Sequence, residues 1–209
     1  MRKAIFLLFL LLFINGYSQK EINSSKRTGQ ISLDGYLEEA DWVNANWTSG
    51  FTQMKPFPGE KASKKTEVAM LFDQEAIYFG VKCYDHPDSV SRVLSLRDDF
   101  NPNLDFFGIF LDTYNDKQNG FFFGLSSRGV QVDAKIFSED FNDLLNLVWR
   151  SKTQINDQGW FAEIKIPYSA LRFPKSDIQT WNINFARQIS RFREEDTWNW
   201  KKKRNTRLK

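Results

Sequence analysis

Tryptophan is the residue type whose placement in this sequence most directly suggests binding chemistry. Five of the tryptophans fall near the expected ends of strands or in loops, at positions 47, 149, 160, 198 and 200. An exposed indole can stack on the apolar face of a pyranose ring while polar side chains around it bind the hydroxyls. We therefore select Trp149, Trp160 and Trp198 as candidate carbohydrate contacts. The alternative is that these rings pack in the protein core.

The segment from residue 95 to residue 105 is the second candidate, because it gathers polar and charged side chains between two expected strands. Arg97, Asp99 and Asp105 are its candidate binding residues, as the rim of a ligand or metal site. The alternative is a charged connector whose arginine and aspartates pair with one another, which stabilises an exposed loop by about 0 to 1 kcal/mol.

Calcium is the cation that such carboxylates could hold, since it prefers oxygen ligands. The aspartates at positions 34, 41, 99, 105 and 112 could converge, but their spacing matches no recognised calcium loop. The sequence therefore predicts no cofactor and no metal site, and leaves calcium open.

Catalysis finds little support in the residue types present. His86 is the single histidine, and the chain contains no CxxC pair and no glycine-flanked serine elbow. Glycoside hydrolysis needs two carboxylates about 5 to 10 Å apart, whereas the acids fall in expected turns or, like Glu163, on the polar face of a strand, where contact with solvent is expected. We expect a protein that is not an enzyme, with Cys83 as a buried, inert thiol.

The elements that must position these residues are strands. Hydrophobic residues alternate with a period of two in short runs separated by turns, which is typical of strands. The expected strands are 66–72, 76–84, 105–113, 120–126, 130–137, 147–155, 160–166 and 181–189, with short helical turns at 34–42, capped by Asp34, and after Pro167. The spacing leaves no room for helices between most strands, so the sequence predicts an all-β, antiparallel, jelly-roll-like sandwich.

The first 18 residues have the pattern of a signal peptide. Arg2 and Lys3 precede an apolar run from Ala4 to Ile14, which is shorter than the ~20 residues needed to cross a bilayer. We expect export to the periplasm, outer membrane or cell surface, with a retained membrane anchor as the alternative. The expected sandwich then occupies residues 19–200.

The charge of the chain is unevenly distributed. Residues 201–209 hold six cations and no acid, which indicates either a solvated basic terminus or a chain cut from a longer product. Without that tail and without Arg2 and Lys3, 21 cations stand against 26 acids. A mildly acidic domain lacks the basic face of a nucleic-acid-binding protein, so we set that class aside.

Three motifs resemble one family. They are ISLDGYLEEADW at 31–42, DQEAIYFGV at 73–81 and GWFAEIKIP at 159–167. In this order they resemble the family 9 carbohydrate-binding module, over nearly the whole chain after residue 18. LDTYND at 111–116, LRF at 171–173 and NFAR at 184–187 are closer to a subgroup that precedes an outer-membrane barrel in Bacteroidetes-type bacteria. The resemblance implies a β-sandwich that binds a polysaccharide or oligosaccharide, in a setting of carbohydrate breakdown, with a barrel as a further partner.

The resemblance also implies departures at the binding site. Sugar-binding members carry a tryptophan, an acid and an arginine at places that Pro102, Gly108 and Gly124 hold here, and a second sandwiching tryptophan near or beyond Trp198. Two readings therefore stay open: a carbohydrate-binding module, or a structural domain that docks on a barrel and has lost sugar binding. A glycoside hydrolase is the third and least supported reading.

Overall fold

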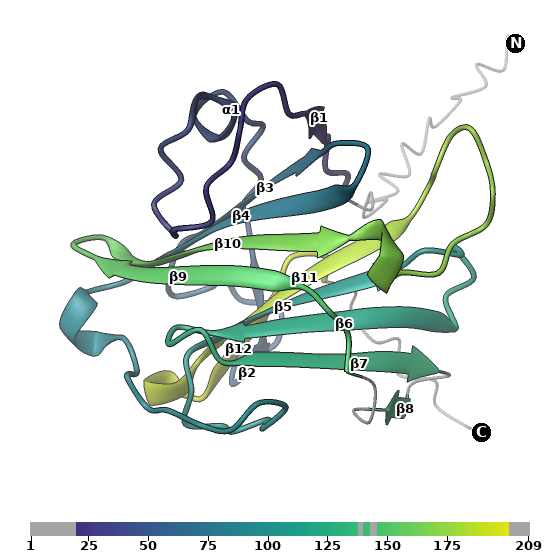
Figure 1. The fold of residues 1–209 in the computed structure, drawn as a ribbon. Coiled ribbons are helices and arrows are strands. Elements are labelled where there is room, and N and C mark those ends of the chain that lie inside the picture. Colours follow the sequence, from purple (N-terminus) through teal and green to yellow (C-terminus); the bar gives the residue numbers. More distant parts are fainter. Residues whose placement is uncertain (1–19, 138–139, 143–145, 201–209) are drawn as a thin grey trace, which may run out of the picture.

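A computed structural model describes residues 20–137, 140–142 and 146–200, which fold into two β-sheets packed face to face (Figure 1). The expected signal peptide and the basic tail lie outside the described residues, and export remains an expectation. Among the described residues, no helix is long and apolar enough to span a membrane. The predicted all-β sandwich is confirmed.

The first sheet has five strands. Their order is β1 (Ser25–Lys26), β3 (Thr66–Phe72), β4 (Ala76–Tyr84), β10 (Gly159–Pro167) and β9 (Arg150–Asn156). All neighbours are antiparallel except β1 and β3, which pair in parallel. β9 is therefore an edge strand, paired on one side with β10.

The second sheet has seven strands, all antiparallel. Their order is β2 (Thr52–Lys55), β12 (Glu194–Thr197), β11 (Asn182–Ile189), β5 (Phe106–Asp112), β6 (Asn119–Ser126), β7 (Gln131–Phe137) and β8 (Asp140–Asn142). The sequence predicted the long strands within one to three residues. It missed β1, β2, β8 and β12, which have two to four residues each and are too short for alternation to stand out.

The core forms between the sheets because alternate residues of each strand face inward. Phe107, Ile109 and Leu111 of β5 are buried in it, whereas Phe106 and Phe110 point to the opposite face and are half-buried. Cys83 is buried, and burial raises the pKa of its thiol to about 12. The prediction that Cys83 is buried is confirmed, and a thiol that resists ionisation is a poor nucleophile.

The helical pieces are shorter than expected. α1 (Ala40–Val43) is one turn preceded by Glu39, and the 3-10 turns are η1 (Pro87–Ser89), η2 (Tyr168–Ala170) and η3 (Ser190–Phe192). The prediction that Asp34 caps this helix was wrong, since its carboxylate accepts a hydrogen bond from the amide of Tyr36 within a tight turn. The turn expected after Pro167 is η2.

The segment with α1 covers the outer face of the five-stranded sheet (Figure 1). Glu163 of β10 anchors it, because its carboxylate accepts hydrogen bonds from the amides of Asp34 and Gly35 and from Nε1 of Trp42, at 2.7 to 2.8 Å. The expectation that Glu163 contacts solvent was therefore wrong. It does lie on the outward side of its strand, but residues far away in the sequence bury that side completely.

Candidate functional site

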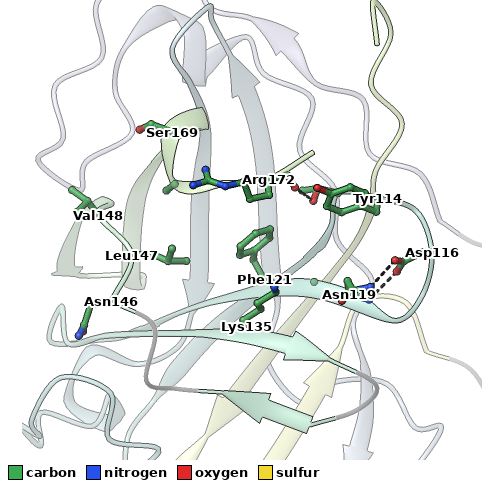
Figure 2. Close-up of a pocket in the computed structure, with 13 residues that line it drawn as sticks. Tyr114, Asp116, Asn119, Phe121, Lys135, Asn146, Leu147, Val148, Ser169 and Arg172 are labelled. Atoms are coloured by element: carbon green, nitrogen blue, oxygen red, sulfur yellow. Dashed lines mark hydrogen bonds between the residues drawn. The ribbon is translucent and has the colours of Figure 1, made fainter. Parts of the chain in front are cut away.

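A cleft of about 660 Å³ opens where β5 leads into β6 (Figure 2). The ends of β5, β7 and β10 and the starts of β6 and β9 meet at this end of the sandwich. The lining combines apolar and polar side chains from five segments: Thr113, Tyr114, Asp116, Asn119, Gly120, Phe121, Lys135, Asn146, Leu147, Val148, Ser169, Ala170 and Arg172. Phe121 and Arg172 lie near its centre, with Tyr114, Asp116 and Asn119 on one side.

The loop between β5 and β6 is fixed by its own aspartates. Asp112 accepts a hydrogen bond from the amide of Lys117 at 2.8 Å. Asp116 accepts from both the amide and Nδ2 of Asn119, at 2.8 Å each. These donors, led by the Asn119 side chain, hold the pKa of Asp116 below its usual value. The carboxylate is therefore ionised at neutral pH and orders the loop that carries Tyr114.

A second contact joins this loop to the segment after β10. The Thr113 hydroxyl donates to the backbone oxygen of Arg172 at 2.5 Å. The exposed guanidinium of Arg172 donates to the backbone oxygen of Leu171 at 3.2 Å and otherwise extends over the cleft (Figure 2). Tyr114 is 49% exposed. An accessible aromatic ring in a cleft that a guanidinium and side-chain amides also line suits a small polar ligand that has an apolar face.

The same cleft gives little support to hydrolytic chemistry. Of the described residues that line it, Asp116 is the one carboxylate, and its oxygens already accept several hydrogen bonds. A glycosidase needs two carboxylates on opposite sides of the scissile bond.

The three tryptophans predicted as sugar contacts are buried instead. Trp160 and Trp198 are 0% exposed and Trp149 is 5% exposed, and all three belong to the core between the sheets. Trp149 donates to Asp133 at 2.9 Å, and Trp198 packs against Phe185 with ring centroids 5.3 Å apart. Both faces of these rings contact protein, so the prediction that they stack on a sugar was wrong. They are inward residues of a sandwich that uses indoles to fill its interior.

The polar loop from residue 95 to residue 105 splits between two roles. Arg97 turns toward the sandwich and pairs with Asp98 at 3.3 Å and with the buried carboxylate of Asp133. Asp105 is buried and accepts hydrogen bonds from the amide and hydroxyl of Ser190, at 2.9 Å each. Asp99 is exposed. The structure does not bring these three together as a rim. Arg97 and Asp105 hold the loop against its neighbours, and the Arg97–Asp98 pair is the kind that the connector alternative predicts.

The aspartates considered for calcium are likewise separate. Among the described residues, no three or more His, Cys, Asp or Glu side chains lie close enough together to hold a metal ion. Asp41, for example, accepts hydrogen bonds from the amides of Thr28 and Gly29, at 3.1 and 2.7 Å.

Gly108 and Gly124 lie directly opposite each other on β5 and β6, on the outer face of the seven-stranded sheet. A Cβ atom on Gly124 would come within 2.1 Å of the Phe106 ring, and one on Gly108 within 2.7 Å of the Phe122 ring. The two glycines therefore make room for phenylalanine rings on a face where related modules were expected to place polar binding residues.

Sequence reasoning did not select the residues of the cleft. Tyr114 and Arg172 both fall in segments quoted for the subgroup resemblance, LDTYND and LRF, which have 54 residues between them along the chain. The Thr113–Arg172 hydrogen bond brings these two motifs together. The available signal was that two turn motifs resemble the same subgroup. Their contact could not be predicted from it, because the contact depends on the order of the strands in the sheets.

Comparison with solved structures identifies the fold. A family 9 carbohydrate-binding module from Caldicellulosiruptor kristjanssonii, solved with cellotriose, superimposes with a TM-score of 0.58 at 18% identity, covering 85% of this chain and 82% of that one. A family 9 carbohydrate-binding module from the same organism, solved with glucose, also superimposes with a TM-score of 0.58 at 18% identity, covering 84% of this chain and 85% of that one. A "putative carbohydrate-binding protein" from Bacteroides uniformis gives 0.70 at 14% identity, over 90% and 94%.

No protein-family model matches the chain, and a search of curated proteins returns no match. At these identities the likeness establishes the fold alone. The described chain has the β-sandwich fold of the family 9 carbohydrate-binding modules.

Proposed function

We propose that this protein is a non-catalytic carbohydrate-binding module of an exported protein, and that it binds a saccharide in the cleft between Tyr114 and Arg172. The observation that carries the proposal is a cleft lined by the half-exposed ring of Tyr114 and by Arg172, on a fold shared with modules solved in complex with cellotriose and glucose. Its setting would be the periplasm, outer membrane or cell surface, in polysaccharide binding and breakdown.

The chemistry of the cleft supports this choice of ligand. Tyr114 offers an aromatic face for the C–H surface of a pyranose. Asn119, Asn146 and Lys135 line the same space and can hydrogen-bond to hydroxyls, while Arg172 supplies a fork of N–H donors.

A docking domain that has lost sugar binding is the second candidate. It is favoured by the burial of the three selected tryptophans and by the phenylalanine rings over Gly108 and Gly124. Such a domain would contact an outer-membrane barrel or another partner and would bind no glycan.

The test is a glycan array with the intact chain, followed by calorimetric titration of cellotriose or the strongest ligand found. Tyr114→Ala should weaken binding by about tenfold or more, since a stacked base or ring contact is commonly worth about 1 to 3 kcal/mol. Tyr36→Ala is the matched control, because Tyr36 is also 49% exposed but lies on the segment that covers the other sheet.

Equal losses in the two variants, or no loss at Tyr114→Ala, would contradict the assignment of the cleft. Absence of binding to every glycan would favour the docking domain. Thermal unfolding of both variants should match that of the unmodified chain, because neither ring is buried.

A further inference from the structure

Two more clefts follow the edge strand β9, away from the cleft of Figure 2. The first, of about 690 Å³, is lined by residues that include Tyr78, Gln131, Trp149, Arg150 and Lys165. The second, of about 460 Å³, lies beside the turn between β6 and β7 and is lined by Arg128 and residues 151–155. Ser151 lines both clefts, so they adjoin along one strand. We refer to the two together as the β9 groove.

The groove is cationic along its whole length. Its lining contributes six positively charged side chains and, among the described residues, no aspartate or glutamate: Arg27, Arg150 and Lys165 in the first cleft, and Arg92, Arg128 and Lys152 in the second. This stands out because the chain between residues 20 and 200 carries an excess of acids. The positive charge is therefore concentrated locally.

Most of these cations have no acidic partner. Within the described part of the chain, ion pairs with carboxylates involve Arg27 but none of the other five. The nearby acids are already engaged, since Asp73 pairs with Arg27 and Asp133 with Arg97. Lys152 lies opposite Glu163 in the pairing of β9 with β10, but no ion pair joins their side chains.

The backbone sets the cations in a row. Arg150 lies directly opposite Lys165 in the pairing of β9 with β10, and Lys165 lies opposite Tyr78 of β4. The Lys165 ammonium lies 5.3 Å from the centre of the Tyr78 ring, which positions it over the sheet. Lys152 is two residues beyond Arg150 on the same face of an edge strand about 20 Å long. A linear ligand lying along this strand would meet two positive charges in its first half, followed by the amides of Gln154 and Asn156.

The β9 groove also adjoins the cleft of Figure 2 along the chain. Asn146, Leu147 and Val148 line the cleft of Figure 2, and the next residues, Trp149 and Arg150, line the groove. One ligand chain could therefore contact both sites in succession.

From this geometry we infer that the β9 groove binds the carboxylate groups of an acidic, uronate-bearing polysaccharide, whose adjoining residue occupies the cleft beside Tyr114. The inference rests on the proposed function and specifies its ligand class. Guanidinium forks bind carboxylates in a bidentate manner, and Gln30 can bind the hydroxyls between the charges. Gln131 donates to the hydroxyl of Ser151 at 2.8 Å, which leaves the Ser151 proton for a ligand oxygen. Single-stranded nucleic acid fits less well, because it needs aromatic faces for base stacking and the groove's Tyr78 and Trp149 are 3% and 5% exposed.

The test compares three probes on the intact chain: polygalacturonate, a neutral cello-oligosaccharide and single-stranded DNA of similar length. Polygalacturonate should bind more tightly than either, with an affinity that falls as salt is raised. The double variant Arg150→Gln and Lys152→Gln should lower its affinity by about tenfold and leave the neutral ligand unaffected. Both side chains are exposed, so the fold should be retained.

Two controls separate the groove from general attraction between opposite charges. Lys61→Gln with Lys175→Gln removes the same charge at exposed positions outside the groove and should change nothing. Lys201→Gln, Lys202→Gln and Lys203→Gln neutralise part of the basic tail. If that variant, rather than the groove variant, abolishes polygalacturonate binding, the inference is overturned.

The outcomes also separate the two proposals. Binding of the neutral ligand without polygalacturonate would overturn the inference and leave the proposed function standing. Binding of no saccharide would overturn both. DNA bound as tightly as polygalacturonate would identify a general polyanion site and overturn the assignment to a polysaccharide.

Discussion

Glu163 and Asp196 are both 0% exposed, yet the protein surrounds their carboxylates in opposite ways. Glu163, beneath the segment that covers the five-stranded sheet, accepts three N–H hydrogen bonds. Asp196, on the inward side of β12, has two oxygens that accept no hydrogen bond from any described residue. Burial raises the pKa of both groups, but for Glu163 the three donors counteract it.

Because of this difference, Glu163 is a structural anchor, whereas Asp196 is a buried acid without hydrogen-bond donors among the described residues. Burial first, and then the neighbouring carboxylate of Glu194, raise the pKa of Asp196 to about 8. Arg187 lies opposite Asp196 in the strand pairing, but its terminal nitrogens donate to Lys65 and Tyr84 of the other sheet. Asp196 is therefore protonated at neutral pH and can donate its proton to a neighbour, whereas Glu163 acts as an acceptor that ties the chain together.

The largest effect should come from removing the anchor. Glu163→Ala leaves the amides of Asp34 and Gly35 and the indole N–H of Trp42 without their acceptor in a buried space. Each unsatisfied donor costs about 1 to 3 kcal/mol, so we expect the free energy of unfolding to fall by at least about 3 kcal/mol in urea titrations. Glu38→Gln, an exposed change in the same segment, should stay within about 0.5 kcal/mol of the unmodified chain. A loss as small as that of the control would contradict the role of Glu163.

Replacing the buried acid Asp196 should raise the free energy of unfolding, and the size of the increase should depend on pH. Because its folded pKa lies above the ordinary value of 3.8, the stability that Asp196 contributes is complete below about pH 4 and is lost as the pH rises to about 8. Asp196→Asn stays neutral throughout, and its amide can donate to Glu194. The free energy of unfolding of the variant should match that of the unmodified chain near pH 4 and exceed it by up to about 5 kcal/mol near pH 9.

Thermal unfolding across this pH range measures the effect. Glu195→Gln is the matched control, because Glu195 is the next residue and pairs with Lys55 at the surface. If the stability difference between Asp196→Asn and the unmodified chain stayed constant with pH, Asp196 would not titrate between these values.

The sequence predicted the sandwich because alternation reports directly which side of a strand is apolar. It could not report what lies against the polar side. Glu163 was placed correctly on the outward face and then misjudged as solvated, since the residues that bury it lie more than 120 positions away. Gly35 and Trp42 in the motif at 31–42 donate hydrogen bonds to Glu163 in the motif at 159–167, so the contact joins two of the motifs that carry the resemblance.

The site was less predictable for a related reason. Trp149, Trp160 and Trp198 were selected for their residue type, but whether an indole is exposed depends on strand parity and on the opposing sheet. Tyr114 and Arg172 form a cleft only because the ends of β5 and β10 meet, and this follows from strand order. Pairing of distant strands is not encoded in any local pattern.

A third carboxylate, Asp73, extends the comparison to low pH, and its replacement should change the free energy of unfolding least. Burial acts to raise its pKa, but the amides of Glu75 and Ala76, then Arg27 and the Tyr78 hydroxyl, lower it to about 2. A depressed folded pKa contributes stability that is present above about pH 4 and is lost as the pH falls toward 2. Asp73→Asn keeps one acceptor for the amides but loses the ion pair with Arg27, so it should cost about 1 kcal/mol at pH 7. That gap should close toward pH 2, while Asp88→Asn, at a side chain 87% exposed, shows none at either pH. If the difference instead persisted at pH 2, Asp73 would stabilise the turn through its shape and not through its charge.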